Sequence, residues 1–241
     1  MAMIDVNSII EQLHERGYFP TVTRYRSSLS WEDVIKVATA IGKSRNPRFV
    51  LDEENRFVYE NFAKWLVCDP SMVALNPEQP NETVPGRLGK GIYIGGNTGS
   101  GKSWCLEIMC ATSLALKFKV GIGKEMNNLY WGNVPAENIC NAFVQDGFIS
   151  RYKSMPIIGI QDLGREPAES VSMGNRMNVL QTLLEYRGDQ TNQITLVTSN
   201  LRISGNKMAE RYGDRVASRL GEMCNYYELK GKDRRTLTSN L

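Results

Sequence analysis

Apolar residues recur at helical spacing in three segments of the first third of the chain. They are SIIEQLHERGYF (8–19), SWEDVIKVATAIGKS (30–44) and ENRFVYENFAKWLVCD (54–69). Spacing of three to four residues places the apolar side chains of each segment on one face of a helix. Ser30 stands where it can cap the second helix. We therefore predict a small helical N-terminal region over residues 1–75.

The next segment, NPEQPNETVPGRLGKG (76–91), has no apolar periodicity and is rich in Pro, Asn and Gly. These residues favour turns and interrupt regular structure. We interpret residues 76–91 as a linker, which leaves residues 92–241 for the main domain.

Beyond the linker, short apolar runs alternate with longer helical patterns. Apolar strands separated by helices favour a parallel sheet that helices cover on both faces, so the predicted fold class is α/β. The predicted strands are 91–96, the region around 117–123, 156–162, 193–201 and 224–231, and the predicted helices are 101–117, 175–188 and 213–223.

The composition of the chain mainly excludes certain classes of protein. A chain of 241 residues with 41% hydrophobic residues can bury a substantial core. It lacks an apolar run of about 18 residues and a signal-peptide pattern, which predicts a cytoplasmic protein without a membrane partner. One histidine excludes multi-histidine metal sites. The net charge of +3 is too small to indicate nucleic-acid binding by itself.

The segment GNTGSGKS (96–103) matches the phosphate-loop pattern G-x-x-x-x-G-K-[ST], between a predicted strand and a predicted helix. Its glycines allow backbone N–H groups to surround a phosphate, and the helix dipole adds positive potential. Lys102 would reach the β- and γ-phosphates of ATP or GTP, and Ser103 would bind Mg²⁺. The predicted nucleotide-binding residues are Gly96, Asn97, Thr98, Gly99, Ser100, Gly101, Lys102 and Ser103.

Two further strand ends carry candidate chemistry. Asp162 ends the apolar strand of MPIIGIQD, and the carboxyl ends of parallel strands meet beside the phosphate loop. We predict that Asp162 binds the metal or orients water. Asn200, or its neighbours Thr198 and Ser199, is placed to hydrogen-bond water or the γ-phosphate, although a plain strand-end turn explains the same residues.

The segment YGDRVASRLGEM (212–223) predicts a helix with Arg215 and Arg219 on a face other than its apolar one. Such arginines are ordinarily solvated charges. Beside a nucleotide site, one of them can instead reach the γ-phosphate held by a neighbouring subunit.

The chain carries four motifs in order: the phosphate loop, the strand that ends at Asp162, the strand that ends at Asn200 and the helix with Arg215. This order of motifs resembles the DnaC/IstB-like group of AAA+ ATPases over roughly residues 90–235. The resemblance implies a five-stranded AAA+ core and ATP as the nucleotide. It also implies that Asn200 acts as a sensor and Arg215 as an arginine finger across a subunit boundary. Arg235 stands where relatives carry a late arginine near the nucleotide, and Arg234 fits that role equally well.

The same resemblance implies contact with DNA by the segment that follows the second strand. Residues 124–154 contain aromatic and basic side chains suited to stacking and phosphate contact, while a core position fits Trp131 equally well. The aromatic and basic residues concerned are Tyr130, Trp131, Arg151, Tyr152 and Lys153.

One departure from the family pattern concerns the acidic strand, which usually ends in two acidic residues. Here the pair is Gln161 and Asp162. A neutral amide is a weak ligand for Mg²⁺, which predicts slow hydrolysis if Gln161 faces the metal. A shift of one residue along the strand would bring Asp162 to the metal instead.

The preferred hypothesis is an ATPase that assembles as a homo-oligomer on single- or double-stranded DNA and acts on a replicative helicase or a transposase through residues 1–75. The alternatives are a nucleotide-gated scaffold with little hydrolysis, in which Gln161→Asp would raise turnover, and a small-molecule kinase. The kinase lacks support because no arginine-rich lid is evident.

Overall fold

The computed structural model describes residues 5–16, 21–231 and 233–234. Within these residues, seven strands form the central sheet, in the order β3-β2-β12-β4-β11-β8-β7. Their bounds are β2 (Val73–Leu75), β3 (Thr83–Pro85), β4 (Gly91–Gly96), β7 (Gly132–Pro135), β8 (Ile157–Leu163), β11 (Ile194–Ser199) and β12 (Cys224–Leu229).

Five neighbouring strands of this sheet, from β12 to β7, run parallel, and β2 and β3 add an antiparallel edge. The predicted α/β fold class with a parallel sheet is therefore confirmed, and four of the five predicted strands belong to that sheet. β8 and β11 are buried along almost their whole length, as strands covered on both faces are.

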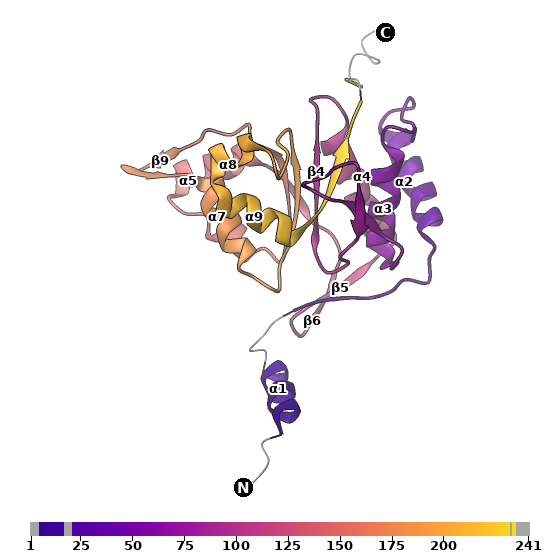
Figure 1. Ribbon diagram of the computed structural model, residues 1–241, viewed down its shortest axis with the longest axis horizontal. Coiled ribbons are helices and arrows are strands. Elements are labelled where there is room, and N and C mark those ends of the chain that lie inside the picture. Colours follow the sequence, from indigo (N-terminus) through magenta and orange to yellow (C-terminus); the bar gives the residue numbers. More distant parts are fainter. Residues whose placement is uncertain (1–4, 17–20, 232, 235–241) are drawn as a thin grey trace.

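Helices cover both faces of the sheet, so the molecule has three layers (Figure 1). One layer contains α2 (Trp31–Arg45), α3 (Arg56–Val67) and α4 (Lys102–Ala115). The other contains α5 (Ala136–Asp146), α6 (Ser150–Ser154), α7 (Val179–Gly188), α8 (Asn206–Tyr212) and α9 (Asp214–Met223). α1 (Val6–Glu15) lies apart from both layers (Figure 1).

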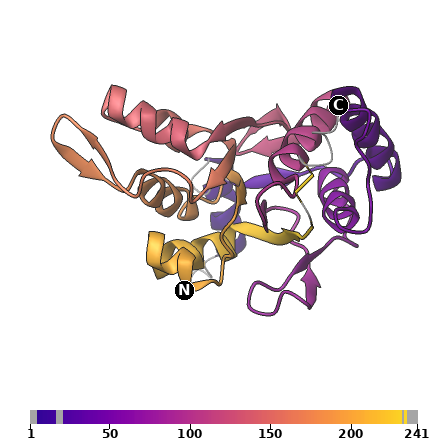
Figure 2. The ribbon, with the colours of Figure 1, turned by 90° about the horizontal axis from the view of Figure 1, so that it is seen from above.

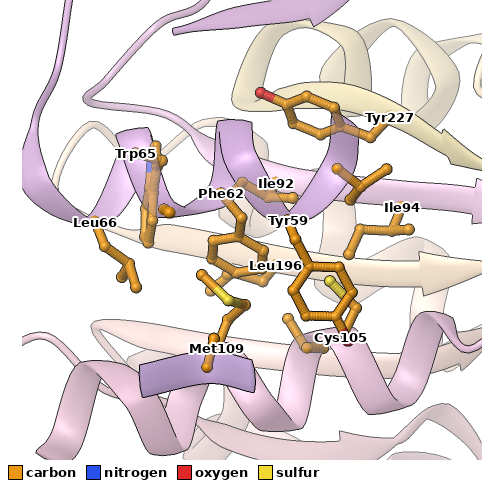
Figure 3. Packing of buried hydrophobic residues seen from close by; sticks show 14 of the residues in the cluster. Tyr59, Phe62, Trp65, Leu66, Ile92, Ile94, Cys105, Met109, Leu196 and Tyr227 are labelled. Atoms are coloured by element: carbon orange, nitrogen blue, oxygen red, sulfur yellow. The ribbon is translucent and has the colours of Figure 1, made fainter. Parts of the chain in front are cut away.

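The first layer shares one hydrophobic core with the sheet. Phe62 and Trp65 of α3 are fully buried between the sheet strand β4 and the helix α4 (Figure 3). Full burial of such a side chain stabilises the fold by roughly 1.5–3 kcal/mol relative to exposure. Helices α2 and α3 therefore pack as part of the sheet's covering layer, and the assignment of residues 1–75 to partner binding stays a prediction.

The segment 76–91, predicted as a linker, contains β3, which pairs with β2 at the edge of the sheet. Arg87 and Asn225 fix the end of this segment, since the Arg87 N–H donates to Asn225 Oδ1 at 2.8 Å. Asn225 Nδ2 donates in return to the carbonyl oxygen of Arg87 at 2.9 Å. Residues 83–91 are thus attached to the sheet rather than spanning between two bodies.

The strand predicted near residues 117–123 exists but lies outside the central sheet. β5 (Lys119–Ile122) forms a small antiparallel sheet with β1 (Val22–Arg24) and β6 (Glu125–Asn128). The fifth parallel strand is β7, which the sequence pattern did not predict. Its sequence, Gly-Asn-Val-Pro, carries one apolar side chain besides proline, so it gave no strand signal.

A second small element is the hairpin of β9 (Ser170–Ser172) and β10 (Asn175–Met177). It follows β8 and projects from one end of the molecule (Figures 1 and 2). Among the described residues, no helix is both long and apolar enough to cross a bilayer.

Candidate nucleotide site

The phosphate loop connects β4 to α4, as the sequence predicted, and α4 begins at Lys102. Gly99 and Gly101 have φ angles of +79° and +92°. Residues with a Cβ rarely adopt this conformation, which explains both glycines. The turn leaves the N-terminal N–H groups of α4 directed toward the loop, where they can bind an anion.

Lys102 is the centre of the loop and is only 5% exposed. Its Nζ donates hydrogen bonds to the carbonyl oxygens of Gly96 at 2.9 Å and Asn97 at 2.7 Å. A third bond goes to Oδ1 of Asn200 at 2.8 Å. The lysine that would bind phosphate is therefore already held against the loop by oxygen acceptors.

Asn200 follows directly after β11, the strand beside β4 in the sheet. Besides accepting from Lys102, it donates from Nδ2 to Thr98 Oγ1 at 3.3 Å. Its amide thus spans the gap between the strand end and the phosphate loop. The structure places Asn200 beside the predicted phosphate position, which a sensor of the γ-phosphate requires.

Asp162 reaches the same cavity through an irregularity in β8. The pairing of β8 with β11 shifts between Val197 and Ser199, and Asp162 has a φ angle of +56°. Its N–H donates to Thr198 Oγ1 at 3.1 Å, and its carboxylate lies 3.5 Å from Nη1 of Arg165. The bulge turns the carboxylate toward the cavity that Lys102 and Ser103 also line.

Gln161 has different surroundings. It is 8% exposed and donates from Nε2 to Oε1 of Glu107 on α4 at 2.9 Å. Glu107 in turn pairs with Arg45 at 2.6 Å. Gln161 is not among the residues that line the nucleotide cavity. Of the two placements left open by the sequence, the structure shows the one in which Asp162 faces the cavity.

The cavity has a volume of about 310 Å³ and lies between the phosphate loop and the connection from α2 to α3. Phe49 of that connection stacks on Trp104 of α4, with ring centroids 6.5 Å apart and planes at 24°. The cavity is thus polar at the phosphate loop and aromatic where Phe49 and Trp104 line it. Its lining also includes Asn46, Arg48, Val50, Asp52, Asn55, Tyr59, Leu229 and Arg234.

Arg234 closes one side of the cavity. Its Nη2 lies 2.8 Å from Oδ1 of Asp52 and 3.3 Å from Oε2 of Glu54, and its N–H donates to the carbonyl oxygen of Gly99 at 3.0 Å. The hydrogen bond from Arg234 lowers the pKa of Asp52. Arg235, the other arginine predicted near the nucleotide, lies outside the described residues.

Arg215 does not line this chain's own cavity. It lies on α9, in the layer opposite α4 (Figure 1), and its side chain is 62% exposed. Its nearest acidic partner is Asp189 at 3.5 Å. Arg219 pairs with the same carboxylate at 2.5 Å and is only 31% exposed. Arg215 is therefore the more accessible of the two predicted finger candidates.

The residues present fit Mg²⁺ and a nucleotide phosphate. Ser103 and Asp162 both line the cavity and offer oxygen atoms, which Mg²⁺ prefers. No group of three or more His, Cys, Asp or Glu side chains is clustered within the described part of the chain. Mg²⁺ ordinarily binds one or two carboxylates together with substrate phosphates, so a site with one carboxylate suits it.

The predicted DNA-contact residues divide into exposed and buried ones. Trp131 is 3% exposed, and its ring stacks on Phe62 at 5.7 Å, so it belongs to the core. Tyr152 is also buried, at 7% exposure. Tyr130 is 52% exposed and stays available for contact.

A phosphate loop between β4, the middle strand of the seven-stranded sheet, and the helix α4 defines a P-loop protein with an α/β fold. No protein-family model matches the sequence. No curated protein sequence matches it either.

Solved structures share the fold. A candidate primosome component from Streptococcus pyogenes serotype M3 has a TM-score of 0.52 and 19% identity, covering 88% of this chain and 94% of its own. The DnaC helicase loader has a TM-score of 0.50 and 16% identity, covering 77% of this chain and 95% of its own. At these identities the likeness concerns the fold, and it agrees with the fold class predicted from the sequence.

Proposed function

We propose that this protein is a cytoplasmic AAA+ ATPase that assembles on DNA and loads or regulates a replicative helicase or a transposase. The observation that carries the proposal is one cavity lined by Lys102, Ser103, Asp162 and Asn200. These four side chains come from three different elements, and each has the chemistry that ATP hydrolysis requires. The two structures of similar fold, a helicase loader and a candidate primosome component, support the choice of partner class.

Each residue has a distinct role in this proposal. The Lys102 ammonium would exchange its carbonyl partners for phosphate oxygens, and Ser103 would offer its hydroxyl to Mg²⁺. Asp162 would hold the metal or orient the attacking water, and Asn200 would hydrogen-bond the same water or the γ-phosphate. Bound Mg²⁺ supplies positive charge that neutralises the phosphates.

The surroundings of Gln161 favour hydrolysis over the scaffold alternative. The slow-hydrolysis hypothesis requires Gln161 to face the metal, but its amide binds Glu107, and Asp162 lines the cavity instead. The carboxylate of Asp162 in the cavity supports the hydrolysis that we propose.

The test is ATP turnover by the purified protein with and without single-stranded DNA, together with its mass in solution with ATP. We expect hydrolysis that DNA stimulates and ATP-dependent assembly. Lys102→Ala and Asp162→Asn should each lower turnover by about 100-fold or more. The first removes positive charge at the phosphates, and the second removes the carboxylate that would hold Mg²⁺ or orient water. Lys207→Ala, an exposed lysine on α8, is the matched control and should leave turnover unchanged.

Other outcomes separate the alternatives. Assembly with ATP but without turnover would overturn the ATPase assignment in favour of the scaffold. A monomer that is indifferent to DNA would overturn the assembly role and favour the kinase.

A further inference from the structure

The small sheet of β1, β5 and β6 lies on the outside of the molecule, below β4 in Figure 1. One of its faces is anchored to the core, since Val120 is fully buried and Val22 and Ile122 pack against the same cluster. Arg24 adds a polar anchor by donating from Nη2 to the carbonyl oxygen of Trp65 at 2.6 Å. The sheet is therefore held firmly from its inner side.

The opposite face of this small sheet is exposed to solvent. Strand side chains alternate between faces, so Tyr25, Lys119 and Met126 lie on the side away from Arg24 and Val120. Tyr25 is 41% exposed and Met126 is 64% exposed. We call this set, Thr23, Tyr25, Lys119, Gly121, Met126 and Asn128, the outer face.

Gly121 allows the tyrosine ring to lie across the outer face. A Cβ at Gly121 would lie only 2.9 Å from Oη of Tyr25 and 3.1 Å from Cβ of Thr23. The absence of a side chain on the middle strand thus lets Tyr25 extend from β1 over β5, toward the strand that carries Met126. The outer face thus presents one exposed aromatic ring, that of Tyr25, and one exposed apolar side chain, that of Met126.

The charge around the outer face is positive. The hairpin sequence KFKVGIGKEMNN (117–128) contains three lysines and one glutamate. Lys117, Lys119 and Lys124 are exposed, and among the described residues none of them has an acidic ion-pair partner within 4.0 Å. Lys119 donates to Asn128 Oδ1 at 2.6 Å, which keeps its ammonium on the outer face.

We propose that the outer face binds single-stranded nucleic acid, with a base stacked on Tyr25 and backbone phosphates near Lys119 and Lys124. Unpaired bases stack on aromatic rings, and lysines beside the ring bind the backbone. A duplex keeps its bases stacked internally and cannot use the ring in this way. The inference rests on the DNA-binding part of the proposed function but not on hydrolysis.

The first experiment measures binding of a fluorescent oligothymidine by the full chain, using anisotropy. Loss of one stacking contact should weaken binding by about five- to 100-fold in Tyr25→Ala, while Tyr25→Phe keeps the ring and should bind like the wild type. Tyr186→Ala is the matched control, because Tyr186 is 40% exposed on α7, away from the outer face. Thermal unfolding checks that the variants fold.

A second pair of variants removes charge without touching the ring over Gly121. Each lost phosphate contact should lower the salt dependence of binding to a single strand by about 0.7 in the slope of log K against log salt. Lys119→Gln combined with Lys124→Gln should therefore reduce that slope by about 1.4. Lys36→Gln combined with Lys207→Gln, two exposed lysines elsewhere, should leave the slope unchanged.

Wild-type affinity and salt slope in both Tyr25→Ala and the double lysine variant would overturn the inference. Equal binding of a duplex and a single strand, unaffected by Tyr25→Ala, would overturn it too. A protein that assembles with ATP on DNA regardless of Tyr25 keeps the proposed function without the outer-face site. Nucleic-acid binding that depends on Tyr25, in a protein that neither hydrolyses ATP nor assembles, would keep the outer-face site and overturn the proposed function.

Discussion

Gln161 and Asp162 are neighbours in the sequence, but the backbone of β8 directs their side chains to different surroundings. Gln161 continues the regular alternation of the strand and reaches Glu107. Asp162 has a positive φ angle, and the paired strand shifts register beside it. A bulge of this kind re-aims one side chain while the strand on both sides stays paired. The catalytic candidate is therefore positioned by backbone geometry.

The backbone geometry of β8 decides which of the two residues, Gln161 or Asp162, faces the cavity, a question that the sequence left open. Alternation along a strand predicts that adjacent residues face opposite sides, but it does not say which one faces the nucleotide. The phosphate loop was predictable because its spacing is diagnostic. The bulge at Asp162 has no comparable sequence signal, since a non-glycine residue occupies the positive-φ position.

The surroundings of Gln161 predict the effect of an isosteric change. Gln161→Glu would place a second carboxylate beside Glu107 in a largely buried position, with Arg45 as the cation at hand. We expect the free energy of unfolding to fall by about 1–3 kcal/mol, because a buried hydrogen bond is replaced by repulsion. Urea denaturation at neutral pH measures this change.

Gln145→Glu on α5 is the control, since Gln145 is exposed, and it should alter stability by less than about 0.5 kcal/mol. A Gln161→Glu variant that is as stable as the wild type and hydrolyses ATP faster would contradict this argument. It would assign Gln161 to the metal side of the site.

Among the elements, those with strong apolar periodicity were predicted well. The predicted helices 30–44, 54–69 and 101–117 correspond to α2, α3 and α4 within a few residues. β7 was missed because two of its four residues are Gly and Pro, and its pairing with β8 depends on tertiary contact. Conversely, the apolar residues of β5 predicted a strand correctly, but local pattern does not specify which sheet a strand joins.

The connection between α2 and α3 is a wall of the nucleotide cavity that the sequence analysis did not anticipate. It has no phosphate-binding motif, and its place becomes evident only when Phe49 packs on Trp104 and Asp52 pairs with Arg234. Arg234 comes from the far end of the sequence. The cavity is therefore completed by an ion pair between segments that are remote in the chain.

The loss of stability on removal of the Asp52–Arg234 ion pair should depend on pH. Arg234 lowers the pKa of Asp52, so its contribution to stability is present above the ordinary aspartate value of 3.8 and is lost as pH falls through the lowered pKa. At pH 7.5, Arg234→Ala should lose a few tenths to about 1 kcal/mol, a range that allows for solvent screening. The difference from the wild type should stay constant down to about pH 4 and shrink as pH falls from there toward about 2 in urea titrations.

Arg176→Ala provides the comparison, because Arg176 is an exposed arginine at 3.9 Å from Glu169. It should lose less stability than Arg234→Ala at pH 7.5. A deficit of Arg234→Ala that is constant from pH 7.5 down to about pH 2 would show that Arg234 stabilises the protein by packing alone.

In the whole molecule, Lys102 and Arg215 belong to helices that cover opposite faces of the central sheet. Lys102 is the first residue of α4, which covers one face of the sheet, whereas Arg215 is exposed on α9, which covers the other face (Figure 1). Since Arg215 does not line the cavity of its own chain, the proposed finger role would require the nucleotide site of another copy. A head-to-tail assembly provides such contacts, because each subunit offers one surface to each neighbour.

We therefore expect Arg215→Ala to bind ATP nearly as well as the wild type, while its assembly weakens and its turnover falls by about 100-fold or more. Arg219→Ala is the matched control on the same helix, since Arg219 is engaged by Asp189 and Glu222, and it should keep most of its turnover. Nucleotide binding is measured with a fluorescent ATP analogue, and turnover by phosphate release. Normal turnover by Arg215→Ala would exclude the finger role.

Mixing two inactive variants tests whether the contact joins different subunits. Lys102→Ala keeps Arg215 but loses its own site, and Arg215→Ala keeps its site but loses the finger. In a random equal mixture at a protein concentration at which both variants assemble, about a quarter of head-to-tail interfaces would combine an intact site with an intact arginine. Turnover should then recover to about a quarter of the wild-type rate. Recovery must depend on total protein concentration, because it requires contact between subunits. If Arg215 instead acted within its own chain, neither variant would contain a complete site, and the mixture would stay as inactive as its components.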